Sequence, residues 1–260
     1  MKVMDKYLNL LRLFFIKPYW AFNIIWYSKY NPFGLSKFHH NKTTHYKNAE
    51  ISYKDLYKFF AIKDDYLKSL YDEISEIKFD TKIYITKIPD FYDASNEFAS
   101  LCYIMVRIKK PSIIVETGVG RGVTSFYILK ALEKNNKGQL YSIDLPVLSK
   151  KAERDIGVLI PDNLKARWHL TLGPGTQVMR KLKNKYGTID IFVHDSNHYY
   201  LNQLAEYKIA INWLSDDGVL ISDDISNDSL IDVNKNYSYK ILTIKQSKPS
   251  YIGMLLKNQR

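Results

Sequence analysis

The chain has 260 residues, enough for one large α/β domain with an appendage, and it carries a formal net charge of +11. A single cysteine, Cys102, excludes an intrachain disulfide, and no cleavable signal is recognisable, so we expect a protein of the reducing cytoplasm. The basic charge is compatible with an anionic partner or substrate. Because Lys, Ile, Asn and Tyr are abundant throughout, we give this charge little functional weight.

The first 48 residues differ from the rest of the chain in composition. Seven lysines and one arginine stand against a single acid, Asp5, and apolar and aromatic residues fill the intervals. Arg12, Lys17 and Pro18 interrupt the apolar run, which therefore falls short of the roughly 20 residues of a membrane span. We predict two short amphipathic helices that break at Pro18. Their composition suits contact with a membrane surface, and the alternatives are a flap over the rest of the chain or a contact with a second copy.

Residues 50–110 predict helices over 53–62, 65–77 and 94–108. The last of these ends in Arg107, Lys109 and Lys110, cations that suit a helix C-terminus. Cys102 lies in its apolar run, which favours inert packing in the core. We therefore divide the chain into a helical extension, residues 1–90, and a main domain, residues 91–260.

The stretch 112–144 organises the main domain. It contains an apolar strand at 113–115, a glycine-rich turn, a helix-period run at 126–132 and a second strand that ends at Asp144. This order is a βαβ unit of an open parallel sheet. Ligands of such sheets bind at the carboxyl ends of the strands.

The spacing of the turn is Glu116-x-Gly118-x-Gly120-x-Gly122. A dinucleotide site requires G-x-G-x-x-G, and a carboxylate is a poor neighbour for pyrophosphate but a good acceptor for an amino group. The spacing therefore argues against an NAD-linked oxidoreductase, which we keep as an alternative, beside an ordinary turn whose glycines only permit positive φ. The pattern resembles motif I of class I S-adenosylmethionine (SAM) methyltransferases. This resemblance implies that the turn approaches the amino-acid end of the cofactor and that Asp144 holds the ribose hydroxyls.

The alternation of strands and helices continues to the end of the chain. We predict helices at 149–157, 178–183 and 201–214, and strands at 166–172, 189–194, 218–222, 239–244 and 251–256. The first three of these strands complete five parallel strands, and QSKPS joins the last two as a hairpin turn. A parallel sheet finished by a hairpin resembles the seven-stranded, Rossmann-like SAM methyltransferase fold.

Thr176 and Gln177 follow the third strand within GPGTQ. Small residues with two hydrogen-bonding side chains at a helix start suit an adenine ring. The alternative is a helix cap by Thr176.

Three carboxylates close the next two strands. Asp195 closes the fourth, and Asp223 and Asp224 close the fifth. These strands are neighbours in the expected sheet, so the three groups converge. Like charges packed together are unfavourable without a cation, and an all-oxygen set suits Mg²⁺. We predict a Mg²⁺ site; alternatively, Asp195 holds only the cofactor and the other two cap a helix.

The ordered set ETGVGRG, SIDLP, VHDSNH and DDGVLISDDI resembles metal-assisted SAM methyltransferases related to macrocin and rhamnosyl O-methyltransferases and to cephalosporin-biosynthesis proteins. The resemblance covers about residues 94–257. It implies Mg²⁺ binding by Asp195, Asp223 and Asp224. It also implies contacts with SAM from Glu116, Gly118, Gly120, Gly122, Asp144, Thr176, Gln177 and Asp195.

His198 follows Asp195 by three residues, where the related catechol-type enzymes have a lysine base. Their metal pair is Asp-Asn, whereas this chain has Asp223 and Asp224. Imidazole is suited to take the proton of a hydroxyl whose pKa a bound Mg²⁺ lowers. We therefore predict His198 and Asp195 as the catalytic residues. The alternative for His198 is an exposed residue at the rim.

These features predict a Mg²⁺-assisted, SAM-dependent O-methyltransferase that acts on a hydroxyl of a sugar, a glycan or another small hydroxylated molecule. A second copy and a membrane surface, contacted through residues 1–48, are further candidate partners. The other class is a non-catalytic SAM-fold protein that binds nucleic acid. No stripe of arginines with interleaved aromatics lines the main domain, so we do not expect a nucleic-acid partner.

Overall fold

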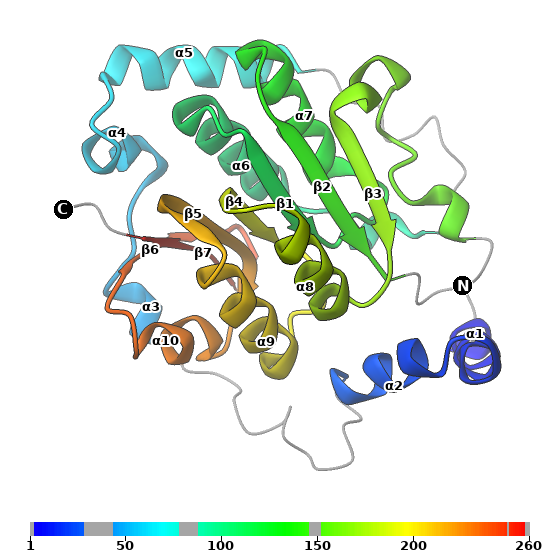
Figure 1. Cartoon of the computed structure of the whole chain (residues 1–260). Coiled ribbons are helices and arrows are strands. Elements are labelled where there is room, and N and C mark those ends of the chain that lie inside the picture. The colour runs from blue at the N-terminus through cyan, green and yellow to red at the C-terminus, as the bar shows by residue number, and fades with distance from the viewer. Residues whose placement is uncertain (1–2, 29–43, 78–87, 146–151, 249, 258–260) are drawn as a thin grey trace.

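A seven-stranded sheet forms the centre of the protein in the computed structural model, which describes residues 3–28, 44–77, 88–145, 152–248 and 250–257. The strand order is β3-β2-β1-β4-β5-β7-β6 (Figure 1). The strands are β1 (Ile113–Thr117), β2 (Gln139–Asp144), β3 (Trp168–Leu172), β4 (Ile189–His194), β5 (Leu214–Ile225), β6 (Lys240–Lys245) and β7 (Tyr251–Leu256). Strands β1 to β5 run parallel, and β7 pairs antiparallel with both β5 and β6. The predicted fold is confirmed.

Helices cover both faces of the sheet, which explains why its central strands are apolar on both sides. On one face lie α5 (Asp64–Ser75), α6 (Asn96–Lys109) and α7 (Val123–Asn135); on the other lie α8 (Gly175–Lys185), α9 (Tyr200–Ile211) and α10 (Ser229–Asn234) (Figure 1). Successive strand residues alternate between these faces. Ile114 accordingly packs in the core with α6 and α7, and Val115 packs with α9.

Helix α6 shows how local sequence signals set an element's ends. The Ser95 side chain accepts a hydrogen bond from the backbone N–H of Phe98 (3.1 Å), a cap that fixes the start of the helix. The helix ends at Lys110, which adopts a left-handed conformation. Cys102 is fully buried on this helix, as the apolar run predicted.

The predicted break at Pro18 is confirmed, because α1 (Val3–Ile16) ends before it and α2 (Pro18–Trp26) begins with it. Both helices lie beyond the carboxyl ends of β2 and β3 (Figure 1), and Trp20 of α2 lies near Gly173, just before α8. Among the helices that the structure describes, none combines the length and apolar character required to cross a membrane. Residues 29–43 of the predicted membrane-contacting segment lie outside the described residues.

Several predicted boundaries require correction. Residues 53–62 form two short pieces, η1 (Tyr53–Asp55) and α4 (Leu56–Phe59), and Ala61 then has a positive φ that stops the helix. Helix α9 ends at Ile211, and the apolar Leu214 begins β5 instead. The start of predicted helix 149–157 lies outside the described residues, and only the short η3 (Ala152–Asp155) follows. Four further short elements are α3 (Thr44–Lys47), η2 (Asp90–Tyr92), η4 (Asp162–Arg167) and α10.

Candidate active site

The predicted site residues lie in two groups at the carboxyl ends of the parallel strands. The first group, here named the glycine edge, consists of residues 116–122 after β1 and Asp144 at the end of β2. The second group, named the acid edge, consists of Asp195 and His198 after β4 and Asp223 and Asp224 near the end of β5. Because β1 lies between β2 and β4, the two edges adjoin at the centre of the sheet.

Gly118 is the point at which the two edges touch. It has φ +85°, and a Cβ atom built there would lie 2.1 Å from the backbone oxygen of Asp195. The backbone N–H of Asp195 donates to the carbonyl of Thr117 (2.8 Å), which holds the two segments against each other. Only glycine permits both this conformation and this close approach.

Asp144 is bound by the glycine-rich turn. Its Oδ2 accepts hydrogen bonds from the backbone N–H groups of Val119 (2.8 Å) and Gly120 (3.0 Å). Burial raises the pKa of Asp144, and these hydrogen bonds partly oppose the rise. The structure thus puts the carboxylate against the turn as the spacing indicated, and its contact with a ribose stays a prediction.

Glu116 points into the interior of the fold. It is fully buried, and its Oε2 accepts hydrogen bonds from the hydroxyls of Ser125 on α7 (2.6 Å) and Ser142 on β2 (2.7 Å). Its Oε1 has no hydrogen-bond partner. Burial raises the pKa of Glu116 to about 7, and the two serine hydroxyls oppose this rise. The predicted contact with the amino group of a cofactor stays a prediction.

The start of α8 meets helix α2. Pro174 precedes the helix without a side-chain cap, so the alternative role of Thr176 as a cap is wrong. Thr176 is buried and instead forms a side-chain hydrogen bond with Tyr27. Burial raises the pKa of Tyr27, and this hydrogen bond opposes the rise. Trp20 lies 3.6 Å from the position of a Cβ atom on Gly173. Helix α2 therefore lies against Gly173 and Thr176 of the segment that we predicted for adenine, and Gln177 is half-buried.

A second set of contacts ties the N-terminal helices to the same side of the sheet. The Asn197 side chain, between β4 and α9, donates a hydrogen bond to the Tyr27 carbonyl (2.6 Å). Arg12 of α1 forms an ion pair with Glu153 (3.2 Å). These contacts join α1 and α2 to the loops that follow β2 and β4.

The acid edge brings together Asp195, His198 and Asp223, whose candidate ligand atoms all lie within 4.8 Å of one another. Asp224 lies beside this group, with Oδ2 3.5 Å from His198 Nδ1. His198 Nε2 has no hydrogen-bond partner and lies 3.9 Å from Asp195 Oδ1. Two carboxylates and an imidazole fit a divalent cation, although Mg²⁺ itself prefers oxygen ligands. The structure thus unites two of the three predicted ligands and adds His198 in place of Asp224.

Burial shifts the protonation equilibria of the acid edge. Burial and the neighbouring Asp223 raise the pKa of Asp195 well above its usual range. Burial and Asp224 raise the pKa of Asp223. Burial and the neighbouring His194 lower the pKa of His198 to about 3. The His198 imidazole is therefore neutral at neutral pH and has a free acceptor nitrogen.

Three residues that sequence reasoning missed come from the turn between β6 and β7. The Lys248 ammonium lies 2.6 Å from Asp224 Oδ1 and 3.1 Å from Asp223 Oδ2. Gln246 Nε2 donates to Asp223 Oδ1 (2.8 Å), and Ser250 donates to Asp224 Oδ1 (2.7 Å). The sequence QSKPS indicated only a turn, because its proximity to β5 depends on the insertion of β7 between β5 and β6.

Residues 115–225 match a family model described as a methyltransferase domain. We name these residues the methyltransferase domain after the family model that they match, which covers less than half of the chain. The domain begins in β1 and ends in β5, so it contains both the glycine edge and the acid edge. The predicted methyltransferase family is confirmed at this level, whereas the narrower group of macrocin, rhamnosyl and cephalosporin-biosynthesis relatives stays a prediction. No curated protein matches the sequence significantly.

Two solved structures share the fold of the methyltransferase domain and its flanking elements. An O-methyltransferase from Bacillus cereus, in complex with SAH, is 17% identical with a TM-score of 0.50; the match covers 81% of this chain and 99% of that one. The O-methyltransferase TomG from Streptomyces achromogenes, involved in tomaymycin synthesis and in complex with SAM, is 12% identical with a TM-score of 0.52, covering 85% and 92%. At these identities the likeness establishes the fold.

A buried polar cluster supports the acid edge of the methyltransferase domain from the opposite side. His194 Nδ1 lies 2.8 Å from Glu206 Oε2, and the Thr117 hydroxyl donates to the same oxygen (2.7 Å). His194 is fully buried, and Glu206 is nearly so. These residues hold the ends of β1 and β4 against α9.

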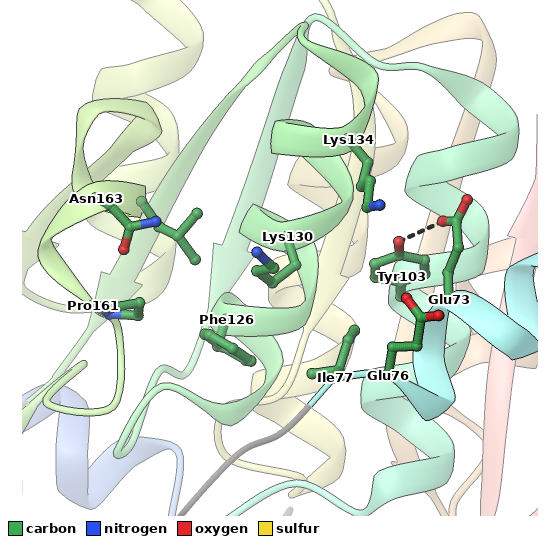
Figure 2. Close-up of a pocket in the computed structure, with 10 residues that line it drawn as sticks. Glu73, Glu76, Ile77, Tyr103, Phe126, Lys130, Lys134, Pro161 and Asn163 are labelled. Carbon is green, nitrogen blue, oxygen red and sulfur yellow. Dashed lines mark hydrogen bonds between the residues drawn. The ribbon is translucent and has the colours of Figure 1, made fainter.

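Figure 2 shows a hollow of about 480 Å³ on another side of the methyltransferase domain. Side chains from α5, α6, α7 and η4 line it, and Tyr103 donates a hydrogen bond to Glu73 at its wall (2.6 Å). Lys130 and Lys134 of α7 and Glu76 are among the residues that line it (Figure 2). None of the predicted site residues lines this hollow, so it lies apart from both edges.

Proposed function

We propose that this protein is a SAM-dependent O-methyltransferase. The observation that carries the proposal is the arrangement of the methyltransferase domain. A glycine-rich turn that binds Asp144 adjoins an edge where a neutral histidine faces carboxylates. The first feature suits a cofactor with ribose hydroxyls, and the second suits an acceptor that must lose a proton. Both structural neighbours are O-methyltransferases in complex with SAH or SAM, which supports the same activity.

In this proposal the glycine edge binds the cofactor. The turn containing Gly118, Gly120 and Gly122 lies against its amino-acid end, and the Asp144 carboxylate accepts from the ribose. Thr176 and Gln177 line the adenine site under α2. Because α2 contacts Thr176, movement of the N-terminal helices accompanies cofactor entry.

The acid edge handles the acceptor. His198 Nε2 takes the proton of the acceptor hydroxyl as the oxygen forms its bond to the methyl carbon and the carbon–sulfur bond breaks. Asp195 and Asp223, with Asp224 beside them, would hold Mg²⁺, which lowers the pKa of a bound hydroxyl. An acceptor with adjacent hydroxyls, such as a sugar or glycan, suits this edge.

Calorimetric titration with S-adenosylhomocysteine (SAH), once with Mg²⁺ and once with EDTA, tests the cofactor assignment. We expect binding in both solutions and at least about tenfold weaker binding by Asp144→Ala, because a carboxylate–hydroxyl hydrogen bond contributes about 1.5–3 kcal/mol. Asp190→Ala, at the opposite end of the parallel strands, is the matched control. Absence of SAH binding by the wild-type protein in both solutions would exclude the proposal.

We further propose that α1 and α2 dock on an anionic lipid surface. Eight of the nine exposed large apolar side chains among the described residues lie between residues 7 and 22, and Phe15 is 89% exposed. The first 48 residues carry seven lysines and one arginine against one acid, which complements anionic headgroups.

Co-sedimentation with vesicles tests this docking surface. We expect binding to vesicles of phosphatidylserine and phosphatidylcholine, weaker binding to phosphatidylcholine alone, and loss of binding in Phe15→Ser/Phe22→Ser. Tyr92→Ser, the exposed aromatic outside the helices, is the control. A double variant that binds as wild type, or a stable wild-type dimer that the double variant abolishes, would contradict the lipid assignment.

A further inference from the structure

The acid edge already contains a cation supplied by the protein. The Lys248 ammonium lies between two carboxylates, 2.6 Å from Asp224 Oδ1 and 3.1 Å from Asp223 Oδ2. Asp223 is 2% exposed, so its charge has almost no access to water. A buried carboxylate is stable only where a charged or hydrogen-bonding partner compensates it. Lys248 is that charged partner.

The turn that carries Lys248 is fixed on both sides of the residue. The backbone N–H of Ser250 donates to the carbonyl of Lys248 (2.7 Å), and that of Gln246 donates to the carbonyl of Ser250 (3.1 Å). The buried Gln246 side chain donates to Asp223 and accepts from Ser95 (2.8 Å). This turn therefore presents Lys248 to the acid edge as part of a bonded network.

The position of Lys248 conflicts with a divalent ion at the same edge. The candidate ligand group of Asp195, His198 and Asp223 shares Asp223 with the lysine. Both oxygens of Asp223 already accept hydrogen bonds, one from Gln246 and one from Lys248. An ion bound to Asp223 would lie within a few ångströms of the ammonium, where like charges repel strongly at low dielectric.

The charge balance of the edge leads to the same conflict. Asp195, Asp223 and Asp224 supply three carboxyl groups, and the Lys248 ammonium contacts two of them. The Lys248 side chain is 36% exposed, so its head has a route to water if another cation replaces it.

We infer that Lys248 is the resident counter-cation of the acid edge and that a divalent metal binds there only by displacing it from Asp223. The affinity of the protein for divalent metal is therefore set by this lysine. At low metal concentration Lys248 neutralises the carboxylates, and at high concentration the metal does so. This inference rests on the proposed function in one respect: it takes from it that the acid edge binds a divalent cation.

Titration of the full-length protein with Mn²⁺, with free Mn²⁺ measured by its electron paramagnetic resonance signal, tests the inference. We expect Lys248→Met to bind Mn²⁺ at least about tenfold more tightly than wild type. In this variant the metal no longer has to break the charge-assisted hydrogen bond between Lys248 and Asp223. Lys248→Arg keeps the charge and should stay as weak as wild type. Lys245→Met, exposed in the neighbouring β6, is the matched control.

Lys248→Met that binds Mn²⁺ no more tightly than wild type, or Lys248→Arg that gains affinity equally, would overturn the inference. If Lys248→Met does not fold, Lys248→Gln, which keeps a hydrogen-bond donor, is measured instead and carries the same expectation. SAH titration of the same samples separates the two proposals. SAH binding with unchanged Mn²⁺ affinity rejects the role of Lys248 alone, whereas loss of SAH binding by wild type rejects the proposed function.

Discussion

The glycine edge and the acid edge stabilise buried carboxylates in opposite ways. At the glycine edge, neutral donors from the same βαβ unit bind each acid: the hydroxyls of Ser125 and Ser142 bind Glu116, and two turn N–H groups bind Asp144. At the acid edge, the donors include a full positive charge, Lys248, which arrives from the C-terminal hairpin. The first edge is thus complete within one βαβ unit, whereas the second depends on distant chain segments.

This difference indicates that the two edges have different functions. A carboxylate held by fixed neutral donors keeps its position when a ligand arrives, which suits binding. A carboxylate held by a side-chain cation that is partly exposed to water is able to exchange that partner, which suits chemistry that moves charge. Four substitutions test this difference, from the largest expected effect to the smallest.

Replacing His198 with alanine removes the proposed base of the acid edge. We expect kcat to fall by about 10²–10⁴-fold, the usual contribution of a general base. SAH affinity should stay within about twofold of wild type, because the substitution lies at the acid edge and leaves the contacts of the glycine edge intact. Because the pKa of His198 is lowered to about 3, the active neutral form persists as pH falls from 8 to 5.

His169→Ala, an exposed histidine on β3, is the control for His198. Methyl transfer to a panel of hydroxylated acceptors provides kcat, and calorimetry provides the SAH affinity. An unchanged kcat in the His198 variant would show that His198 is not the base and only lies at the rim of the site.

Replacing Gly118 with alanine tests the contact between the edges. The new Cβ would lie 2.1 Å from the Asp195 backbone oxygen at a φ of +85°. We expect the free energy of unfolding to fall by about 2–4 kcal/mol and SAH binding to weaken. Gly187→Ala, where nothing lies within 4 Å of the new Cβ, should change stability by less than about 0.5 kcal/mol. Urea denaturation of both variants measures the difference; equal stabilities would mean that the two edges do not meet at Gly118.

Replacing Glu116 with glutamine tests whether the glycine edge contains a protonated acid. Burial raises the pKa of Glu116 to about 7, so the unfolded chain loses this proton at lower pH than the folded protein. Wild-type stability should therefore fall as pH rises from about 4.5 to 7, by about 2–4 kcal/mol from this group. Glu116→Gln should lack this part of the loss and gain relative stability across the same window.

Urea denaturation between pH 4.5 and 8 measures this difference. Glu76→Gln, on the exposed C-terminus of α5, is the control and should follow the wild-type curve. Parallel pH curves for wild type and Glu116→Gln would show that Glu116 is already ionised in the folded protein.

Replacing Thr124 with valine gives the smallest effect. The Thr124 hydroxyl, on the first turn of α7, donates to Asp195 Oδ2 (2.9 Å) and so links a helix of the glycine edge to the acid edge. Removal should reduce the free energy of unfolding by about 1–2 kcal/mol, the usual effect of a lost hydrogen bond to a charged group. Thr171→Val, exposed on β3, is the control in thermal denaturation. A Thr124 variant as stable as its control would exclude this link.

The fold and the methyltransferase domain were predictable because their signals are local. Each strand is an apolar run bounded by turns, and the hairpin strand 251–256 was predicted with its observed ends. The spacing of Gly118 and the position of Asp144 followed from one continuous stretch. Neighbouring strands then required Asp195 and Asp223 to approach each other, and the structure has them in one group.

The partners of the carboxylates were not predictable, because contacts between separate elements of the fold set them. Lys248 belongs to a turn 25 residues after Asp223, and its approach depends on how β7 inserts into the sheet. Glu116 turned inward because Ser142 lies directly beside it in the β1–β2 register. Alternation along a strand gives the face of a side chain, but the donors on that face come from other elements.

The position of β7 between β5 and β6 has a consequence for synthesis on the ribosome. Translation delivers Asp195, Asp223 and Asp224 before the segment that contains Lys248, and chains begin to fold from the N-terminal side as they emerge. Until β7 pairs with β5, the nascent sheet has an open strand edge, the kind of surface that chaperones protect. The pairing of β7 with β5 covers that edge and brings the ammonium to the carboxylates, so the acid edge acquires its cation only when this hairpin is in place.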